Sequence, residues 1–417
     1  MKEEVFHSNF PTIVNSIELN ELFDKIVQHF LSRGYTQRML TEYIRIIGHF
    51  IYWVENEHYF FPMTEEVIMS RFYTEHLPIC QCPVSTGCRS RYPSALRHII
   101  DVLRRDGMVV LTSVKLEKPI DRIIADYENH LITVCGTTCS TCRHYTRHVR
   151  FFLEEIYTDG SFDITRLQVR DIVGFFSRNI ANYTPVTLQS IATSIRSFLR
   201  YTVFKGLCNA CLVDAVPSIA HWRCSSLPKS LSVQQRKSFL SAFDQSTSIG
   251  RRDYTIALCL IGLGMRSCEV ADLDLDHIDW RKGTLSIHSS KGRRTHQLPL
   301  SQEIGQSIAD YIIHDRPSSE VRNIFVQHRA PLGARLTSGA IGAIIRKTFK
   351  RCGITMPFSG SHVLRHTAAT DMIRSGARIK EVADILGHRN INTTCIYTKV
   401  DLPTLSSVAL PWPGEVK

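Results

Sequence analysis

The first half of the chain carries the same succession of apolar positions twice, and this repetition restricts the folds it can adopt. Residues 43–54 (YIRIIGHFIYWV) and 145–156 (YTRHVRFFLEEI) share five positions of like character: Tyr43 with Tyr145, Arg45 with Arg147, Ile47 with Val149, Phe50 with Phe152 and Val54 with Ile156. Two further helical patterns follow each copy, at 63–72 and 94–105 in the first and at 167–176 and 190–201 in the second. Because the apolar positions follow the period of a helix, the sequence predicts two tandem helical bundles.

Composition and pattern divide the chain into four parts. We expect a helical domain at 1–112, a second at 118–215, a domain of mixed structure at 228–400 and a tail at 401–417. Residues 217–230 (PSIAHWRCSSLPKS) are rich in proline and serine, as linkers are. The predicted fold is therefore mainly α, with two N-terminal helical bundles followed by an α+β domain that contains a small β-hairpin or sheet.

Three local patterns organise the mixed domain. Residues 253–265 form an apolar run of helical length that ends in glycines, so Arg266 should lie at a break between two buried helices. Alternation at 284–287 and its return at 297–300 predict a hairpin with Lys291 near the tip. Residues 363–373 and 379–386 are amphipathic, and this pattern places His362 and Arg365 at a helix start, where backbone N–H groups favour phosphate.

The same domain contains five short motifs in a fixed order. They are GMRSCE at 264–269, SKGRR at 290–294, SHVLRH at 361–366, LGH at 386–388 and IYTK at 396–399. Each motif alone is common in ordinary structure, but their order and spacing resemble the active site of the tyrosine recombinases, the phage integrase family of DNA strand-transfer enzymes. The resemblance covers roughly the last 190 residues.

The chemistry of strand transfer agrees with these residue types. A phosphodiester resists attack because its transition state gathers negative charge, so a catalyst needs fixed cations, and the forks of Arg266 and Arg365 can each hold a phosphate. The resemblance implies that Tyr397 is the nucleophile and forms a 3′-phosphotyrosyl link, which stores the bond energy. Neither a metal nor another cofactor is then expected in the site.

The remaining site residues are assigned through the same resemblance. Lys291, next to a cationic cluster, is the candidate acid for the leaving 5′-oxygen. His362 and His388 would hydrogen-bond the phosphate or shuttle the tyrosine proton. Glu269, one turn after Arg266, would orient the guanidinium, although an ordinary helical ion pair is the alternative. His366, Thr367 and Asp371 are interpreted as caps or supporting partners.

The two helical domains have different expected roles. The second resembles the core-binding domain that clamps DNA opposite the catalytic domain in this family. The first departs from the family's small, sheet-rich arm-binding domains, and it would extend the DNA contact or join protomers. Arg97, Arg104 and Arg105 along its third helix favour DNA, although a solvated face explains them nearly as well.

The charge distribution favours a DNA partner for the catalytic half. The chain has 50 Lys and Arg against 39 Asp and Glu, and residues 228–417 hold 26 and 16 of these, an excess of 26 − 16 = +10. Double-stranded DNA is therefore the expected partner, bound more weakly as salt rises. The charged N-terminus lacks a signal-peptide pattern, and the longest apolar stretches are too short to span a bilayer. These features predict a soluble cytoplasmic protein associated with the nucleoid, with no membrane partner.

The 13 cysteines fit an intracellular protein with reduced thiols. They group as Cys80, Cys82 and Cys88; Cys135, Cys139 and Cys142; and Cys208 with Cys211. The C-x-x-C pairs at 139–142 and 208–211 could close one zinc site, but Cys142 aligns with Leu40 in the repeat, which indicates a core position. We therefore expect no metal.

The resulting hypothesis is a site-specific DNA recombinase of an integrase or transposase type, from a phage or another mobile element. By the resemblance it would act as a homotetramer on two DNA sites, alone or with partner recombinases. Its apolar tail at 401–417 would dock on a neighbouring protomer or fold back. Two alternatives remain open. One is a type IB topoisomerase-like enzyme, and the other is a DNA-binding accessory protein that has kept the fold and lost the chemistry.

Overall fold

The chain divides into two compact units, one formed by residues 112–225 and the other by residues 1–111 together with 226–417. The computed structural model describes residues 17–59, 62–65, 67–83, 87–110, 119–158, 162–220, 230–288, 295–354, 360–388, 390 and 393–400. Residues 221–229 of the linker predicted at 217–230, and the tail at 401–417, lie outside these residues. Apolar side chains bury themselves in separate clusters, so the first bundle, the second bundle and the mixed domain are treated in turn. The predicted domain limits stay a prediction.

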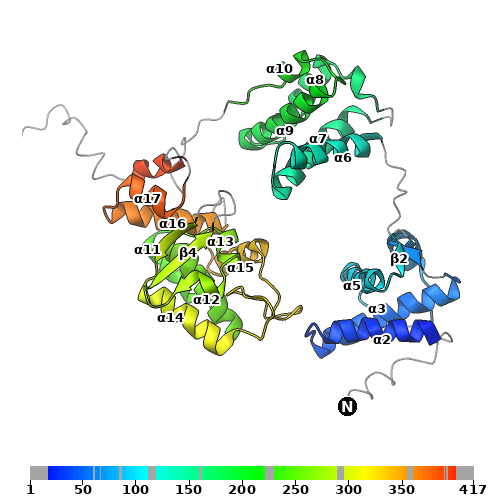
Figure 1. Cartoon of the computed structure of the whole chain (residues 1–417), viewed down its shortest axis with the longest axis horizontal. Helices are drawn as coiled ribbons and strands as arrows, with labels where there is room; N and C mark the ends of the chain where they lie inside the picture. Colours follow the sequence, from blue (N-terminus) through cyan, green and yellow to red (C-terminus); the bar gives the residue numbers. More distant parts are fainter. Residues whose placement is uncertain are drawn as a thin grey trace, which may run out of the picture. The chain divides into compact units, whose positions relative to one another are not determined.

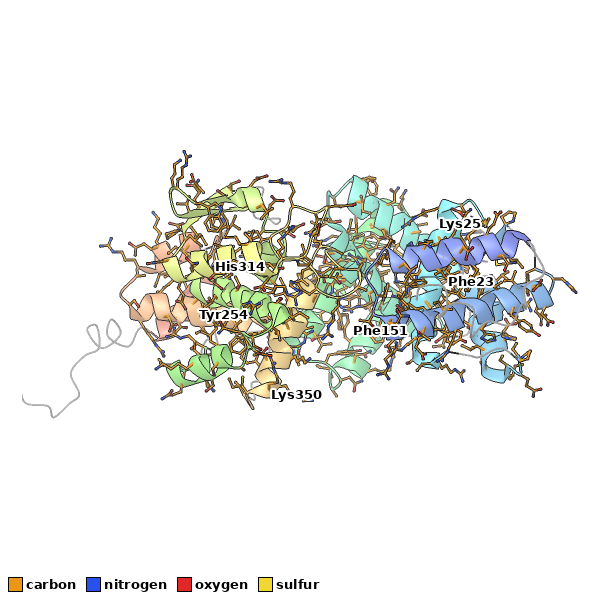
Figure 2. The ribbon with its side chains drawn as sticks, turned by 90° about the horizontal axis from the view of Figure 1, so that it is seen from below. Phe23, Lys25, Phe151, Tyr254, His314 and Lys350 are labelled. Atoms are coloured by element: carbon orange, nitrogen blue, oxygen red, sulfur yellow. The ribbon has the colours of Figure 1, made fainter. Side chains whose placement is uncertain are left out.

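Helices dominate the first bundle. Its elements are α2 (Ile17–Leu31), α3 (Gln37–Asn56), the π-helix η1 (Val67–His76), α4 (Leu77–Ile79), η2 (Arg89–Arg91) and α5 (Tyr92–Arg105). The helices α2, α3 and α5 pack against one another around apolar side chains. Phe23 of α2 packs against this cluster, whereas Lys25 of the same helix pairs with Asp106 at the surface (Figure 2). A two-residue parallel pairing of β1 (Met63–Thr64) with β2 (Val109–Val110) was not predicted, because two residues carry no periodicity.

The second bundle repeats this packing. Its elements are α6 (Pro119–Thr133), α7 (Cys139–Ile156), η3 (Ile164–Arg166), α8 (Val169–Asn179), α9 (Pro185–Phe204) and α10 (Cys211–Asp214). The hydroxyls of Thr138 and Thr184 accept hydrogen bonds from backbone N–H groups in the first turns of α7 and α9 and so cap these helices. Three pairs of positions matched by the repeat are fully buried in both bundles: Ile47 with Val149, Phe50 with Phe152, and Ile68 with Ile172. At two other pairs, Tyr43 and Val54 are buried but Tyr145 and Ile156 are half-buried, so burial agrees with the predicted repeat only in part.

The mixed domain is built around one buried helix, α12 (Ser248–Gly262), which lies among the other elements in Figure 1. It packs against α13 (Ser267–Ala271), α14 (Gln302–Asp310), η5 (Tyr311–Asp315), α15 (Ser338–Arg351) and α16 (Ser361–Arg374). The other helices are α11 (Val233–Ser241), η4 (Leu275–His277), α17 (Ile379–Ile385) and η7 (Cys395–Val400). The side chain of Arg236 on α11 pairs with Asp371 on α16 at 2.6 Å.

A three-stranded antiparallel sheet covers part of this domain. Its strands lie in the order β3 (Ile278–Asp279), β4 (Thr284–His288) and β5 (Thr295–Pro299). The β4–β5 pair confirms the predicted hairpin, with Ser286 opposite Gln297, whereas the short β3 was not predicted. The described fold is thus mainly α with one small sheet in the last domain, as expected from the sequence. Across the described residues, every helix is too short or too polar to cross a membrane.

Candidate active site

The first site arginine lies at a break between two helices, as predicted. Arg266 is the N-cap of α13, and its guanidinium donates to Glu269 Oε1 at 2.5 Å. The backbone N–H of Arg266 donates to Oε2 of the same carboxylate at 2.8 Å. Glu269 is 5 % exposed, so its charge is directed toward this partner rather than into water. The carboxylate therefore fixes both the backbone and the side chain of Arg266.

A glycine makes the break possible. Gly264 has φ of +62°, in the left-handed region that favours glycine, and a Cβ there would lie 2.7 Å from the Cδ2 atom of Leu386. The segment after α17 can therefore lie directly against the end of α12. The starts of α13 and α16 are also joined, by a hydrogen bond between the hydroxyls of Ser267 and Ser361.

The second arginine lies deep in this junction. Arg365 is 6 % exposed, and its guanidinium donates to the carbonyls of Gly264, at 2.6 Å, and of Leu386. Its Nη1 lies 3.9 Å from Glu269 Oε2, so one carboxylate serves both arginines. Burial, and next the nearby Arg266 charge, lower the pKa of Arg365 to about 10. The side chain remains a cation at neutral pH and is held rigidly.

The predicted nucleophile lies in the same region. Tyr397, on η7, is 2 % exposed and packs with Ala369, Ile373 and Val382. Its hydroxyl is hydrogen-bonded to Nδ1 of His366 at 2.7 Å. Burial raises the pKa of Tyr397 to about 12, although the charge of Arg365 opposes this shift. The phenol is therefore protonated at neutral pH and almost fully buried.

His388 lies close to both arginines. Burial lowers its pKa to about 4, and the charges of Arg365 and Arg266 act in the same direction. Its Nδ1 is hydrogen-bonded to Thr394 Oγ1 at 2.8 Å, which leaves Nε2 as the other polar atom of the ring. The structure therefore supplies a neutral imidazole beside two guanidinium groups.

The two remaining predicted residues are His362 and Lys291. His362, the second residue of α16, is exposed, and its charge contributes to lowering the pKa of His366. Lys291 lies in 289–294, outside the described residues. The last pair of the hairpin, His288 with Thr295, leads into that segment.

Sequence reasoning undervalued His366 and missed His296. Burial lowers the pKa of His366, and its contact with the tyrosine hydroxyl is direct rather than supporting. Burial also lowers the pKa of His296 on β5, which is influenced by Glu269, Arg266 and Arg365 and would lie 3.2 Å from a Cβ on Gly387. The signal for His296 was its position two residues before the buried Leu298, on the same face of the strand.

The site thus combines two fixed guanidinium groups, four histidines and a buried phenol around a single carboxylate. The histidines are His296, His362, His366 and His388. Such a set suits an anionic ligand with tetrahedral oxygens, because the cations are preorganised and the imidazoles can accept or donate protons. The phenol is the group in this set that can act as a nucleophile.

Comparison with known proteins agrees with this chemistry. The model of the phage integrase family matches residues 229–402. The putative integrase/recombinase y4rA of Sinorhizobium fredii is 36% identical over 326 residues, which cover 78% of this chain and 79% of that protein. Tyrosine recombinase XerD of Listeria innocua is 30% identical over 296 residues, 69% of this chain and 96% of that protein.

Solved structures resemble the fold at low sequence identity. The XerH site-specific recombinase bound to a palindromic difH substrate has a TM-score of 0.57 at 16% identity, with 70% of this chain and 97% of that chain covered. The Tn1549 transposon integrase in complex with transposon right end DNA has a TM-score of 0.53 at 17% identity, with 68% and 99% covered.

Proposed function

Because the chain belongs to the phage integrase family and is a site-specific DNA recombinase, we propose that it breaks and rejoins DNA strands through Tyr397. The observation that carries this proposal is the position of the Tyr397 hydroxyl, bonded to His366 and influenced by the Arg365 charge.

The proposed cleavage transfers one phosphoryl group and conserves its bond energy. The Tyr397 oxygen attacks the scissile phosphorus, the new O–P bond forms, and the bond to the 5′-oxygen breaks. Arg266 and Arg365 neutralise the non-bridging oxygens as negative charge builds. Rejoining is the reverse reaction, in which a 5′-hydroxyl attacks the 3′-phosphotyrosine.

Two protons must move during cleavage. His366 Nδ1 lies 2.7 Å from the phenol oxygen, which is near enough to accept the phenol proton as that oxygen attacks. Burial lowers the pKa of His366, so its imidazole is neutral and has a nitrogen free of a proton. Lys291 is the proposed donor to the leaving 5′-oxygen. His388, a neutral imidazole beside the arginines, would bind a non-bridging oxygen.

Cleavage also needs a movement of η7. Tyr397 is 2 % exposed and packs in an apolar cluster, so a phosphate in the site can reach its hydroxyl only after this segment shifts. We expect DNA binding to cause this shift, because a bound phosphate would interact with Arg266 and Arg365 beside the tyrosine. The Tyr397 hydroxyl would then become able to attack only when DNA is bound.

Assembly and the roles of the bundles belong to the same proposal. The second bundle would hold the duplex against the catalytic domain, and four protomers would join two DNA sites through the tail at 401–417. The first bundle would extend this contact. Arg104 of α5 is paired with Glu65 and Arg105 contacts His29 Nδ1 at 3.4 Å, which leaves Arg97 as the better candidate for a phosphate contact.

A nicked suicide substrate made from the ends of the host element tests the nucleophile. We expect full-length protein to form a covalent adduct on it and Tyr397→Phe to form none while binding DNA normally, because only one oxygen is removed. Tyr254→Phe, a change to a half-buried tyrosine on α12 (Figure 2), is the matched control and should retain the adduct. Adduct formation by Tyr397→Phe would refute the assignment, and relaxation of supercoiled DNA that lacks any recombination site would favour the topoisomerase alternative.

A further inference from the structure

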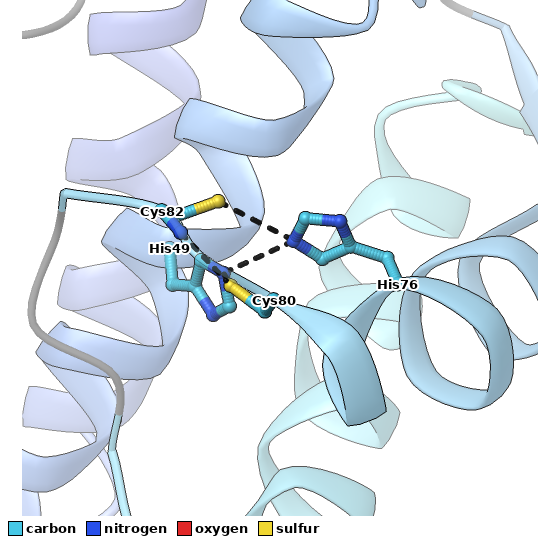
Figure 3. Close-up of side chains that lie close together, drawn as sticks. All are labelled: His49, His76, Cys80 and Cys82. Carbon is cyan, nitrogen blue, oxygen red and sulfur yellow. Dashed lines mark hydrogen bonds between the residues drawn. The ribbon is translucent and has the colours of Figure 1, made fainter.

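Four potential metal ligands converge in the first bundle, far in sequence from the active site. His49 comes from α3, His76 from the end of η1, and Cys80 and Cys82 from the segment that follows α4 (Figure 3). The ligand atoms of all four residues lie within 4.8 Å of one another. We propose that His49, His76, Cys80 and Cys82 bind a structural zinc ion.

The spacing of the ligand atoms fits one central ion. His49 Nε2 lies 3.1 Å from Cys80 Sγ and 3.3 Å from His76 Nε2, and His76 Nε2 lies 3.4 Å from Cys82 Sγ. With Zn–N bonds of about 2.0 Å and Zn–S bonds of about 2.3 Å, tetrahedral ligand atoms lie about 3.3–3.8 Å apart. Two of the three distances fall at the short end of this range and the 3.1 Å distance lies just below it, so small outward side-chain movements would admit the ion.

Mutual closeness distinguishes this cluster from a hydrogen-bonded chain. A chain of thiols and imidazoles needs contacts only between successive groups, whereas every pair here lies within the same short limit. Around a metal, all ligands approach one centre and are therefore close in every pairing. Two thiolates and two neutral imidazoles also balance the charge of Zn²⁺, so the site adds no net charge beside the buried Phe72 and Trp53.

Surrounding groups orient the ligands as in known metal sites. Nδ1 of His49 is hydrogen-bonded to the Tyr92 hydroxyl at 2.8 Å, and both side chains are fully buried. A proton on Nδ1 donated to Tyr92 leaves the Nε2 lone pair facing the cluster, which is the usual arrangement of a ligating histidine. The backbone N–H of Cys82 points to Cys80 Sγ at 3.3 Å and would stabilise a thiolate there.

The type of ligand selects the metal. Two sulfur and two imidazole ligands in a tetrahedral arrangement favour zinc over magnesium or calcium, which prefer oxygen. With four protein ligands the site is closed, as in structural rather than catalytic zinc centres. Its role would be to tie α3 to the irregular segment around α4, where short helices bury few apolar side chains.

The other cysteines of the sequence hypothesis do not share this arrangement in the described residues. Cys142 is fully buried, and its thiol points to the carbonyl of Glu128, as its core position in the repeat predicted. Cys208 points to the carbonyl of Ile164, and Cys139 and Cys211 are exposed. The C-x-x-C pairs therefore do not form the site that their spacing suggested, and the C-x-C of Cys80 and Cys82 provides it instead.

Zinc content of the purified full-length protein tests the proposal. Protein produced with zinc sulfate and freed of loosely bound metal should retain about one zinc per chain, released by a mercurial reagent that blocks thiolates. Cys80→Ser and Cys82→Ser should each lose this zinc, and Cys88→Ser, a change to an exposed cysteine close to the cluster in sequence but outside it, should retain it. Absence of zinc from the unaltered protein, or full retention in both cluster variants, would overturn the proposal.

A cobalt experiment keeps the proposal testable if the serine variants fail to fold. Co²⁺ exchanged into the unaltered protein should give the intense visible bands of a tetrahedral site together with sulfur-to-metal charge transfer. His76→Cys should still bind the metal and strengthen the charge-transfer band, since it replaces a nitrogen by a third sulfur. Weak bands of an octahedral ion, or a spectrum unaffected by His76→Cys, would show that the metal is bound elsewhere and would overturn the assignment.

Discussion

Histidines gather in two regions of this molecule, and the two clusters differ in what surrounds them. In the first bundle, His49 and His76 face the sulfur atoms of Cys80 and Cys82. In the catalytic domain, His366 and His388 lie near guanidinium groups instead. Burial is the leading cause of a lowered pKa in all four imidazoles, so burial alone does not separate the clusters.

The neighbours decide which ligand each cluster can hold. Thiols become thiolates beside a metal and attract a cation, whereas arginines stay charged and attract a phosphate. A group of buried histidines therefore identifies a binding site but not the sign of its ligand. The charges within a few ångströms give the sign, and they predict that each cluster can be disabled without the other.

Among changes to the groups that surround Tyr397, the largest effect is expected from removing the buried arginine. Arg365→Met should lower suicide-substrate cleavage by about 10³-fold or more, because it removes a fixed cation and leaves the Gly264 and Leu386 carbonyls unpaired. Zinc content should stay unchanged. Loss of zinc together with cleavage would mean that the two clusters are not independent.

Removing the metal with a chelator tests whether the first cluster can be disabled without the catalytic cluster. A strong zinc chelator should lower the thermal midpoint of the first bundle by several degrees or more, because the metal is part of its fold. Adduct formation on the suicide substrate should fall by less than about 10-fold, since no residue near Tyr397 takes part in the metal site. If Cys82→Ser reduced adduct formation as much as Tyr397→Phe does, the two clusters would not be independent.

A smaller effect is expected from the histidine that contacts the nucleophile. His366→Gln should slow cleavage by about 10²-fold, because it removes the proposed proton acceptor. The loss should narrow at high pH, where the Tyr397 phenol releases its proton to water. His314→Gln, a change on the exposed surface of η5 (Figure 2), is the control. A loss that does not depend on pH would reduce His366 to a packing role.

The smallest effect concerns acid stability. The folded pKa of His388 is about 4, below its ordinary value of 6.5, so between these values the unfolded chain binds a proton that the folded protein refuses. Stability of the catalytic domain should therefore fall as pH drops through this window, and His388→Gln should flatten the profile. Sulfate, as an anion that can bind near the arginines, should offset this loss of stability between pH 6.5 and about 4. It should not prevent the zinc site in the first bundle from releasing its metal at acid pH. Sulfate protection that is equal in Arg365→Met would argue against an anion site.

Much of the catalytic domain could be predicted because its signals are local. The break before Arg266 follows from glycines next to an apolar run, and the hairpin follows from alternation on both sides of a turn. The resemblance to the tyrosine recombinases likewise indicated Arg365, which lies on α16, and His388, which follows α17.

Contacts between distant segments were less accessible to sequence reasoning. The partner of Tyr397 depends on how η7 lies against α16, so the sequence could not choose among the nearby histidines. The metal cluster joins His49 to His76 across 27 positions, from separate helices. The sequence shows only that His76 is close to Cys80 and Cys82. Their C-x-C spacing differs from the C-x-x-C spacing on which the sequence-based zinc hypothesis rested.

The hydrogen bonds of Arg365 affect how inactive relatives of this protein can be recognised. Because its guanidinium holds the carbonyls of two separate segments, Gly264 and Leu386, a chain that has abandoned strand transfer would still need it to keep its shape. Tyr397 contributes less to holding the fold together, since phenylalanine would fill the same apolar space. A degenerate copy of this gene should therefore lose its tyrosine long before its arginine, and a surviving arginine is poor proof of activity.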